Sequence, residues 1–160
     1  MEQIKNNFKS NILLVSTDKY LINCISDFKV KNIENINSFE ITSNVFEARN
    51  VLNTQIIDLV LLDIHLPFIN GLELLNTNKN QPFETIVFSN SNKFKNEATK
   101  FSIFEYIIMP SNYEFIEDNL TNALKKIYKN FTFKAKLNNL KNWNLNFQVL
   151  AKYKTYQILS

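Results

Sequence analysis

The sequence contains very little glycine, cysteine or proline. Of its 160 residues, one is glycine (Gly71), one is cysteine (Cys24) and three are proline. A single cysteine excludes an intrachain disulfide and a cysteine-based metal site, and the helical spacing of apolar residues around Cys24 predicts that it packs in a core. A single glycine excludes a glycine-rich phosphate-binding loop.

Long apolar runs are also missing. No run approaches the roughly 18 residues that span a bilayer, and the first residues lack the apolar core of a signal peptide. Hydrophobic residues make up 45% and charged residues 21% of the chain, as in an ordinary globular protein. We therefore expect a soluble cytoplasmic domain with a short extension and no membrane insertion.

Acidic residues are absent after Asp118. Residues 119–160 carry a charge of +8, which leaves −5 for residues 1–118 because the net charge is +3. The lysines responsible are Lys125, Lys126, Lys129, Lys134, Lys136, Lys141, Lys152 and Lys154. This asymmetry indicates either an anionic partner (nucleic acid, a membrane surface or an acidic protein face) or a helix face and tail that the lysines keep solvated.

Apolar periodicity alternates between strands and helices along the chain. Short apolar runs predict strands at 11–15, 39–43, 58–62, 85–89 and 105–109, and apolar residues at helical intervals predict helices at 19–30, 45–52, 71–76, 93–101 and 113–129. Parallel strands need long crossover connections, so this order predicts an α/β fold with helices on both faces of a parallel sheet.

Ligands of such sheets bind at the carboxyl ends of the strands. The residues at those ends are Ser16, Thr17, Asp18, Asp63, Ser89 and Pro110. Two of them also have ordinary structural interpretations. Asp18 fits the N-cap of the first helix, and Asp63 fits the cap of the turn that follows its strand.

Four segments together resemble the receiver domain of bacterial two-component response regulators, over residues 11–129. They are Asp63-Ile-His-Leu-Pro67, Asn70-Gly71-Leu-Glu-Leu, Ile86-Val-Phe-Ser89 and Glu105-Tyr106-Ile-Ile-Met109-Pro110. The resemblance implies a flavodoxin-like, doubly wound, five-stranded parallel sheet with strand order 2-1-3-4-5.

The resemblance also implies a phosphoacceptor, and Asp63 occupies that position. A carboxylate attacking a phosphoryl group needs Mg²⁺ and a cation nearby, so the family supplies two acids after the first strand and a lysine after the fifth. This chain has Ser16 and Thr17 in place of the acids and Met109 in place of the lysine. With fewer charges around it, Asp63 should also be less perturbed than in a crowded acidic pocket.

Ser89 and Tyr106 match the hydroxyl and the aromatic residue that report phosphorylation in this family. They are equally consistent with a strand-end hydroxyl and a surface aromatic. His65 matches ordinary loop filler in the family, with its backbone carbonyl facing a metal. A weak Mg²⁺ site would then consist of Asp18, Asp63 and that carbonyl, and no cofactor would be required.

A haloacid-dehalogenase-like phosphatase would also use an aspartate at a strand end. That chemistry needs a second aspartate two residues later, where this chain has His65. We therefore predict that the chain is not an enzyme.

The chain divides by this interpretation into an N-terminal extension (1–10), a receiver-like domain (11–129) and a basic, aromatic C-terminal segment (130–160). Residues 131–137 and 143–149 alternate apolar and polar residues as strands do, yet Phe133, Leu137, Leu140 and Phe147 fit helical spacing. The segment is too short for a complete DNA-binding domain, although residues 154–159 resemble part of one. It would serve as a truncated output region or as a self-association arm that buries Trp143, Phe147 and Tyr153.

We therefore expect an atypical receiver that signals through protein contacts or dimerisation, with impaired or absent phosphorylation of Asp63. Its partner would be a sensor kinase or a downstream regulator. A homodimer would form through the fourth helix, fifth strand and fifth helix, or through the arm. The alternatives are a DNA-binding regulator that uses the basic segment and a receiver still phosphorylated at Asp63.

Overall fold

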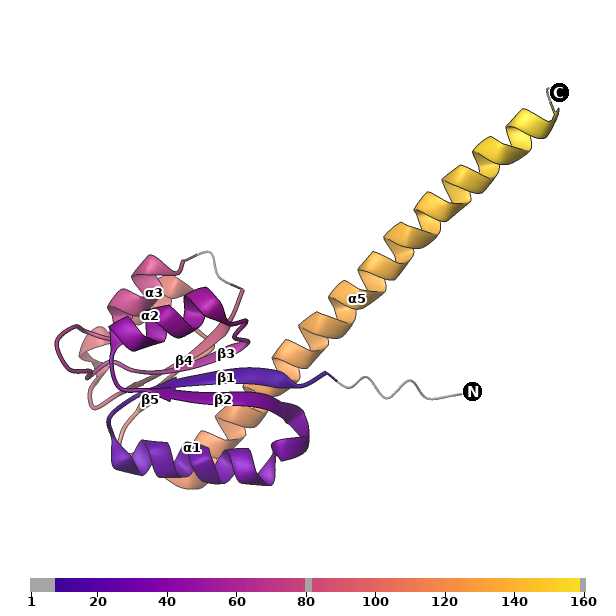
Figure 1. Ribbon diagram of the computed structural model, residues 1–160. Helices are drawn as coiled ribbons and strands as arrows, with labels where there is room; N and C mark the ends of the chain where they lie inside the picture. The colour runs from indigo at the N-terminus through magenta and orange to yellow at the C-terminus, as the bar shows by residue number, and fades with distance from the viewer. Residues whose placement is uncertain (1–7, 80–81, 159–160) are drawn as a thin grey trace. The chain divides into compact units, whose positions relative to one another are not determined.

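A computed structural model describes the backbone of residues 8–79 and 82–158, and side chains as far as residue 142. Five strands form one parallel sheet (Figure 1). They are β1 (Ser10–Val15), β2 (Ile36–Thr42), β3 (Leu59–Asp63), β4 (Glu84–Ser89) and β5 (Glu105–Ile108). The strand order is β2-β1-β3-β4-β5, which confirms the predicted flavodoxin-like fold.

The three central strands are buried on both faces because their apolar residues are continuous rather than alternating. All five residues of β3 are buried. Leu13 of β1, Val60 of β3 and Val87 of β4 join one hydrophobic cluster on a face of the sheet. This core holds the carboxyl ends of β1, β3 and β4 in fixed positions, and the candidate site lies there.

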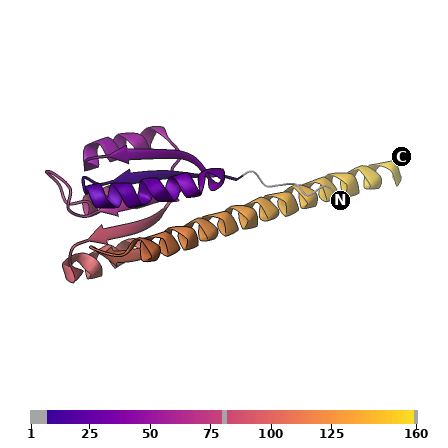
Figure 2. The same ribbon diagram turned by 90° about the horizontal axis from the view of Figure 1, so that it is seen from below.

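Helices cover both faces of the sheet. They are α1 (Lys19–Lys31), α2 (Val45–Thr54), α3 (Leu72–Thr77), α4 (Lys95–Ala98) and α5 (Tyr113–Ile158). Figure 1 shows α2 and α3 on one face and α1 on the other, and Figure 2 shows α1 lying along the strands. Cys24 is buried in the inward row of α1, so its predicted packing role is confirmed.

The first turns of α5 lie on the same face as α1. Lys31 Nζ is 3.7 Å from Glu117 Oε1, and the hydroxyl of Tyr20 donates to the carbonyl of Ser111 at 3.0 Å. Both contacts are exposed, so they contribute little stability. The start of α5 is capped by Asn112, whose Oδ1 accepts from the N–H of Phe115 at 2.8 Å.

The helix predicted at 93–101 is broken. Residues Asn92–Phe94 and Thr99–Phe101 are 3-10 turns, and only Lys95–Ala98 is α-helical. Ala98 is the one buried residue of α4. A segment with so little packing gains little from a regular helix, because most helical stability in proteins comes from a buried face.

The prediction that the last helix ends at residue 129 is wrong, because α5 continues to Ile158. No glycine or proline follows Pro110 to end it. Of the two interpretations of 131–137 and 143–149, the helical one is confirmed and the strand one is wrong, because α5 runs through both segments. The side chains of Trp143, Phe147 and Tyr153, assigned to a self-association arm, lie outside the described ones.

The chain forms two compact units, Met1–Lys125 and Lys126–Ser160. We call residues 126–158, the described part of the second unit, the extension. No helix in the described part of the chain has the length and hydropathy needed to cross a membrane. Whether 1–10, 11–129 and 130–160 are functional divisions stays a prediction.

Candidate functional site

The candidate site lies at the carboxyl edge of the sheet. Asp63 ends β3, Ser89 ends β4 and Ser16 directly follows β1. Neighbouring parallel strands end at the same edge of the sheet. Ser16 and Ser89, which are 47 and 26 positions from Asp63 in the sequence, therefore lie near it. A pocket of about 220 Å³ opens at this edge. It is lined by Thr17, Asp18, Leu21, Asp63, His65, Phe88, Ser89, Asn90 and Met109.

Both carboxylate oxygens of Asp63 accept hydrogen bonds from the protein. Ser16 Oγ donates to Oδ2 at 2.9 Å, and the backbone N–H of His65 donates to Oδ1 at 2.8 Å. The residue is only 8% exposed. Burial raises the pKa of Asp63 above its usual value, while the bonds from His65 and Ser16 act in the opposite direction. The negative charge of Asp18 adds only a minor increase, so burial rather than like-charge crowding dominates.

Ser16 links Asp63 to the start of α1. The backbone N–H of Asp18 donates to Ser16 Oγ at 3.0 Å, so this hydroxyl accepts one bond and donates another. Asp18 Oδ1 accepts from the N–H of Leu21 at 2.7 Å, which confirms its predicted N-cap role. Sequence reasoning treated Ser16 only as a missing acid and did not foresee its bond to Asp63.

Gly71 allows the loop after β3 to pack against the strand end. A Cβ atom at this position would lie 2.3 Å from the carbonyl oxygen of Asp63, far inside van der Waals contact. The N–H of Gly71 donates to the carbonyl of Ile64 at 3.0 Å. The close backbone approach therefore requires glycine.

The ring of His65 faces the pocket. His65 Nε2 lies 3.3 Å from Ser89 Oγ, and the ring makes an edge contact with Phe94 at a centroid distance of 6.2 Å. The sequence predicted that His65 is an ordinary loop residue, because the pattern around Asp63 does not show which side chains reach Ser89. The spacing of His65 two residues after a strand-end aspartate was the only available signal.

Ser89 and Tyr106 are connected through Ser91. The N–H of Ser91 donates to Ser89 Oγ at 3.3 Å, and the hydroxyl of Tyr106 donates to the carbonyl of Ser91 at 2.7 Å. Tyr106 is 6% exposed, so the surface-aromatic interpretation is wrong. A role for the two residues as a switch stays a prediction.

Met109 lines the pocket at the position where the resemblance implies a lysine. Its backbone N–H donates to the carbonyl of Ser89 at 2.7 Å, which holds the segment after β5 against the end of β4. A thioether makes only weak hydrogen bonds and carries no charge. Met109 therefore cannot neutralise a phosphoryl group.

The pocket does not fit Mg²⁺ well. This ion prefers near-octahedral oxygen coordination through carboxylates and water, and the carboxylates lining the pocket are those of Asp18 and Asp63. Both oxygens of Asp63 and one of Asp18 already accept hydrogen bonds. Within residues 8–79 and 82–158, no three histidine, cysteine, aspartate or glutamate residues form a group suited to a metal.

No model of a known protein family matches the chain. A curated relative, the transcriptional regulatory protein MalR of Bacillus subtilis (strain 168), is 28% identical over 123 residues. That match covers 72% of this chain and 51% of the relative. The chain thus spans about half the length of the protein it matches.

Solved structures of receiver domains share the fold. The response regulatory domain of protein mrkE from Klebsiella pneumoniae superposes with a TM-score of 0.68 at 15% identity, covering 74% of this chain and 98% of that one. A response regulator receiver domain protein from Methanospirillum hungatei JF-1 gives 0.65 at 22% identity, covering 76% and 98%. The fold is therefore that of a response-regulator receiver domain. Fold alone does not assign function.

Proposed function

We propose that this chain is an atypical receiver that signals through protein contacts, with little or no phosphorylation of Asp63. The observation that supports it most directly is the bonding of Asp63. Its carboxylate is buried and satisfied by Ser16 Oγ and the N–H of His65, and its pocket contains Met109 rather than a cation.

The missing groups are the ones that phosphoryl transfer needs. Developing charge on the phosphoryl oxygens must be stabilised by a metal and a cation, because the protein does little covalent chemistry itself. Losing a charge-assisted hydrogen bond of the lysine type costs about 1.5–3 kcal/mol. Replacing both acids by Ser16 and Thr17 weakens metal binding as well, so the two deficits combine.

A receiver of this kind would signal through the conformation that it already holds. Tyr106 is buried with its hydroxyl on the carbonyl of Ser91, so the surface around β5 is set without a phosphoryl group. Ile108 of β5 is 42% exposed and Phe115 of α5 is 48% exposed. These apolar side chains favour this surface as the contact for a second copy, a kinase or a downstream regulator.

Acetyl phosphate with Mg²⁺ tests the proposal. We expect no phosphate-dependent gel shift and no mass increase for the natural chain. The variant Ser16→Asp/Thr17→Asp/Met109→Lys restores the charged groups and should gain a shift that adding Asp63→Ala abolishes. A shift of the natural chain that is lost in Asp63→Ala would contradict the proposal and support a still phosphorylated receiver.

DNA binding is a second candidate. The charge of +8 in residues 119–160 favours it, as does the description of the curated relative as a transcriptional regulatory protein. The continuous helix α5 leaves no helix-turn-helix within the described part of this segment. A mobility-shift assay at two salt concentrations checks this candidate, because each phosphate contact releases counterions and affinity should fall steeply with salt. No shift at low salt would exclude it.

A further inference from the structure

The extension carries a narrow row of exposed apolar side chains. Phe133 is 62% exposed, Leu137 40% and Leu140 62%. Their spacing of four and then three residues places them on one side of the helix. In the sequence this spacing continues through Asn144 to Phe147. A row of this width is the pattern of a two-helix seam rather than of a broad apolar face.

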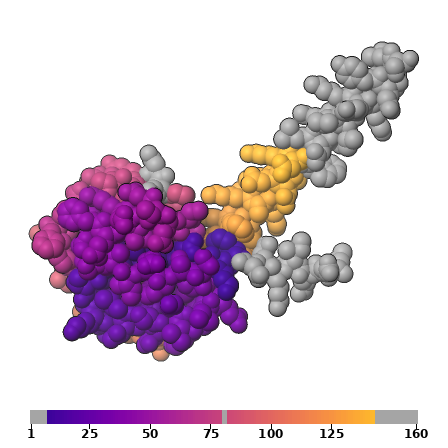
Figure 3. Space-filling model, viewed as in Figure 1, coloured from indigo at the N-terminus to yellow at the C-terminus, as the bar shows by residue number. Residues whose placement is uncertain are grey.

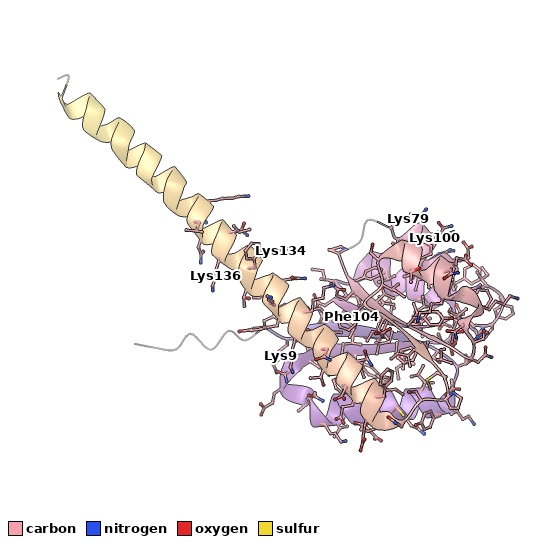
Figure 4. All side chains as sticks on the ribbon, turned by 180° about the vertical axis from the view of Figure 1, so that it is seen from behind. Lys9, Lys79, Lys100, Phe104, Lys134 and Lys136 are labelled. Carbon is pink, nitrogen blue, oxygen red and sulfur yellow. The ribbon has the colours of Figure 1, made fainter. Side chains whose placement is uncertain are left out.

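Lysines border the row on both sides. Lys134 and Lys141 each follow a row residue, and Lys136 precedes Leu137. All three are exposed, and Figure 4 shows Lys134 and Lys136 projecting from different sides of α5. Figure 3 shows this part of the extension in amber. Any helix that covers the row must therefore place its own flanking residues next to these ammonium groups.

A second copy of the extension is a poor partner for the row. No acidic residue follows Asp118, so in no register or orientation can a lysine of one extension pair with a carboxylate of the other, and the lysines of both copies would gather beside the seam. Like charges beside a helical seam destabilise pairing.

Nucleic acid and membranes match the row less well than a helix does. Contacts to phosphates would use the lysines and leave Phe133 and Leu140 in water. A helix lying on a membrane needs a strongly charged polar face opposite its apolar face. In the extension the lysines border the row, and the opposite side presents Ala135, Asn138 and Asn142 together with the partly exposed rings of Tyr128 and Phe131 rather than a charged face.

We propose that the extension binds an amphipathic helix of another protein, whose apolar row is flanked by glutamate or aspartate. The acidic flanks complement Lys134, Lys136 and Lys141, and the two apolar rows exclude water from one another. This inference names a partner class for the interaction role proposed above and is independent of Asp63. A phosphorylated Asp63 would overturn the earlier proposal and leave this one standing.

Two labelled synthetic peptides test it against the full chain at physiological salt. Both have four heptads with leucine in the seam, one flanked by glutamate and the other by lysine. Fluorescence anisotropy should show at least about tenfold tighter binding of the glutamate peptide. The variant Lys134→Glu/Lys136→Glu/Lys141→Glu should reverse this preference. Equal affinities, or a preference that survives the charge reversal, would overturn the proposal.

The apolar row has its own control. Leu137→Asn/Leu140→Asn should weaken glutamate-peptide binding at least about tenfold, whereas Asn138→Ala/Asn139→Ala, also at exposed positions, should leave it unchanged. Binding to phosphatidylserine vesicles or to duplex DNA without binding to the glutamate peptide would overturn the proposal. Light scattering gives a further test. If the natural chain is a dimer, the leucine variant is a monomer and the glutamate peptide does not bind, the row pairs with a second copy and the proposal is overturned.

Discussion

At the Asp63 pocket, the charged neighbours typical of a receiver are replaced by Ser16, Thr17 and Met109, and the one buried carboxylate is satisfied by internal hydrogen bonds. In the extension, lysines lie exposed beside apolar side chains that nothing in the described residues of that unit buries. The pocket has thus lost groups that its chemistry would need. The extension displays groups that a folded chain alone does not need, and this is why we propose recognition for the extension rather than for the pocket.

The largest effect is expected at the corner after β3, where the loop that contains Gly71 packs against the end of the strand. Gly71→Ala places a Cβ atom against the carbonyl oxygen of Asp63, at 2.3 Å in the present geometry. Because that oxygen belongs to the backbone, the loop must shift, and we expect a loss of about 3 kcal/mol in the free energy of unfolding. Urea denaturation measures it. Glu73→Ala, at an exposed position in the same region, should cost less than about 0.5 kcal/mol. Equal effects would show that the corner is not tightly packed.

Tyr106→Phe tests the connection behind the pocket. The hydroxyl of Tyr106 donates to the carbonyl of Ser91 at 2.7 Å, so its removal should cost about 1 kcal/mol. Tyr113→Phe is the matched control, since its hydroxyl makes a longer contact of 3.4 Å to Glu117 Oε1. That control should lose less than about 0.5 kcal/mol by the same measurement. If both variants behave alike, the buried hydroxyl does not hold Tyr106 in place.

Asp63→Asn tests the balance between burial and hydrogen bonding. Burial raises the pKa of Asp63, so the folded chain binds this proton more tightly than the unfolded chain does. Stability should therefore fall as pH rises from the ordinary aspartate value of about 4 to the raised folded value, and stay lowered above it.

Asparagine removes that charge. We expect Asp63→Asn to be more stable than the natural chain at pH 7 and to lose this gain near pH 3, measured by thermal unfolding at both values. Asp118→Asn, at an exposed position, should change little. A destabilised Asp63→Asn would mean that the bonds from Ser16 and His65 outweigh the burial of the charge.

The smallest effect is expected in the extension. A chain ending at Asn130 keeps the first compact unit, Met1–Lys125, so its free energy of unfolding should change by less than about 0.5 kcal/mol. Light scattering should find the same oligomeric state for both chains. If the natural chain is a dimer and the chain ending at Asn130 is not, the result would instead support a self-association arm in the extension.

Local patterns predicted much of the fold. Continuous apolar runs identified the central strands because strands buried on both faces need no polar alternation. Asp18 was recognised as an N-cap because capping depends only on neighbouring residues. The end of α5 was predicted wrongly. The apolar residues of 131–137 fit both the two-residue period of a strand and the 3.6-residue period of a helix, so the pattern alone did not decide between them.

The sequence by itself determined that Asp63 ends a buried strand and that Ser16, Thr17 and Met109 occupy the positions where the receiver resemblance calls for charge. Only the tertiary structure decided that Ser16 bonds to Asp63, that the His65 ring reaches Ser89, and that Tyr106 is buried against Ser91. The physical reason is distance along the chain. These partners lie on different strands and loops, and they meet only because the parallel sheet brings its carboxyl ends to one edge.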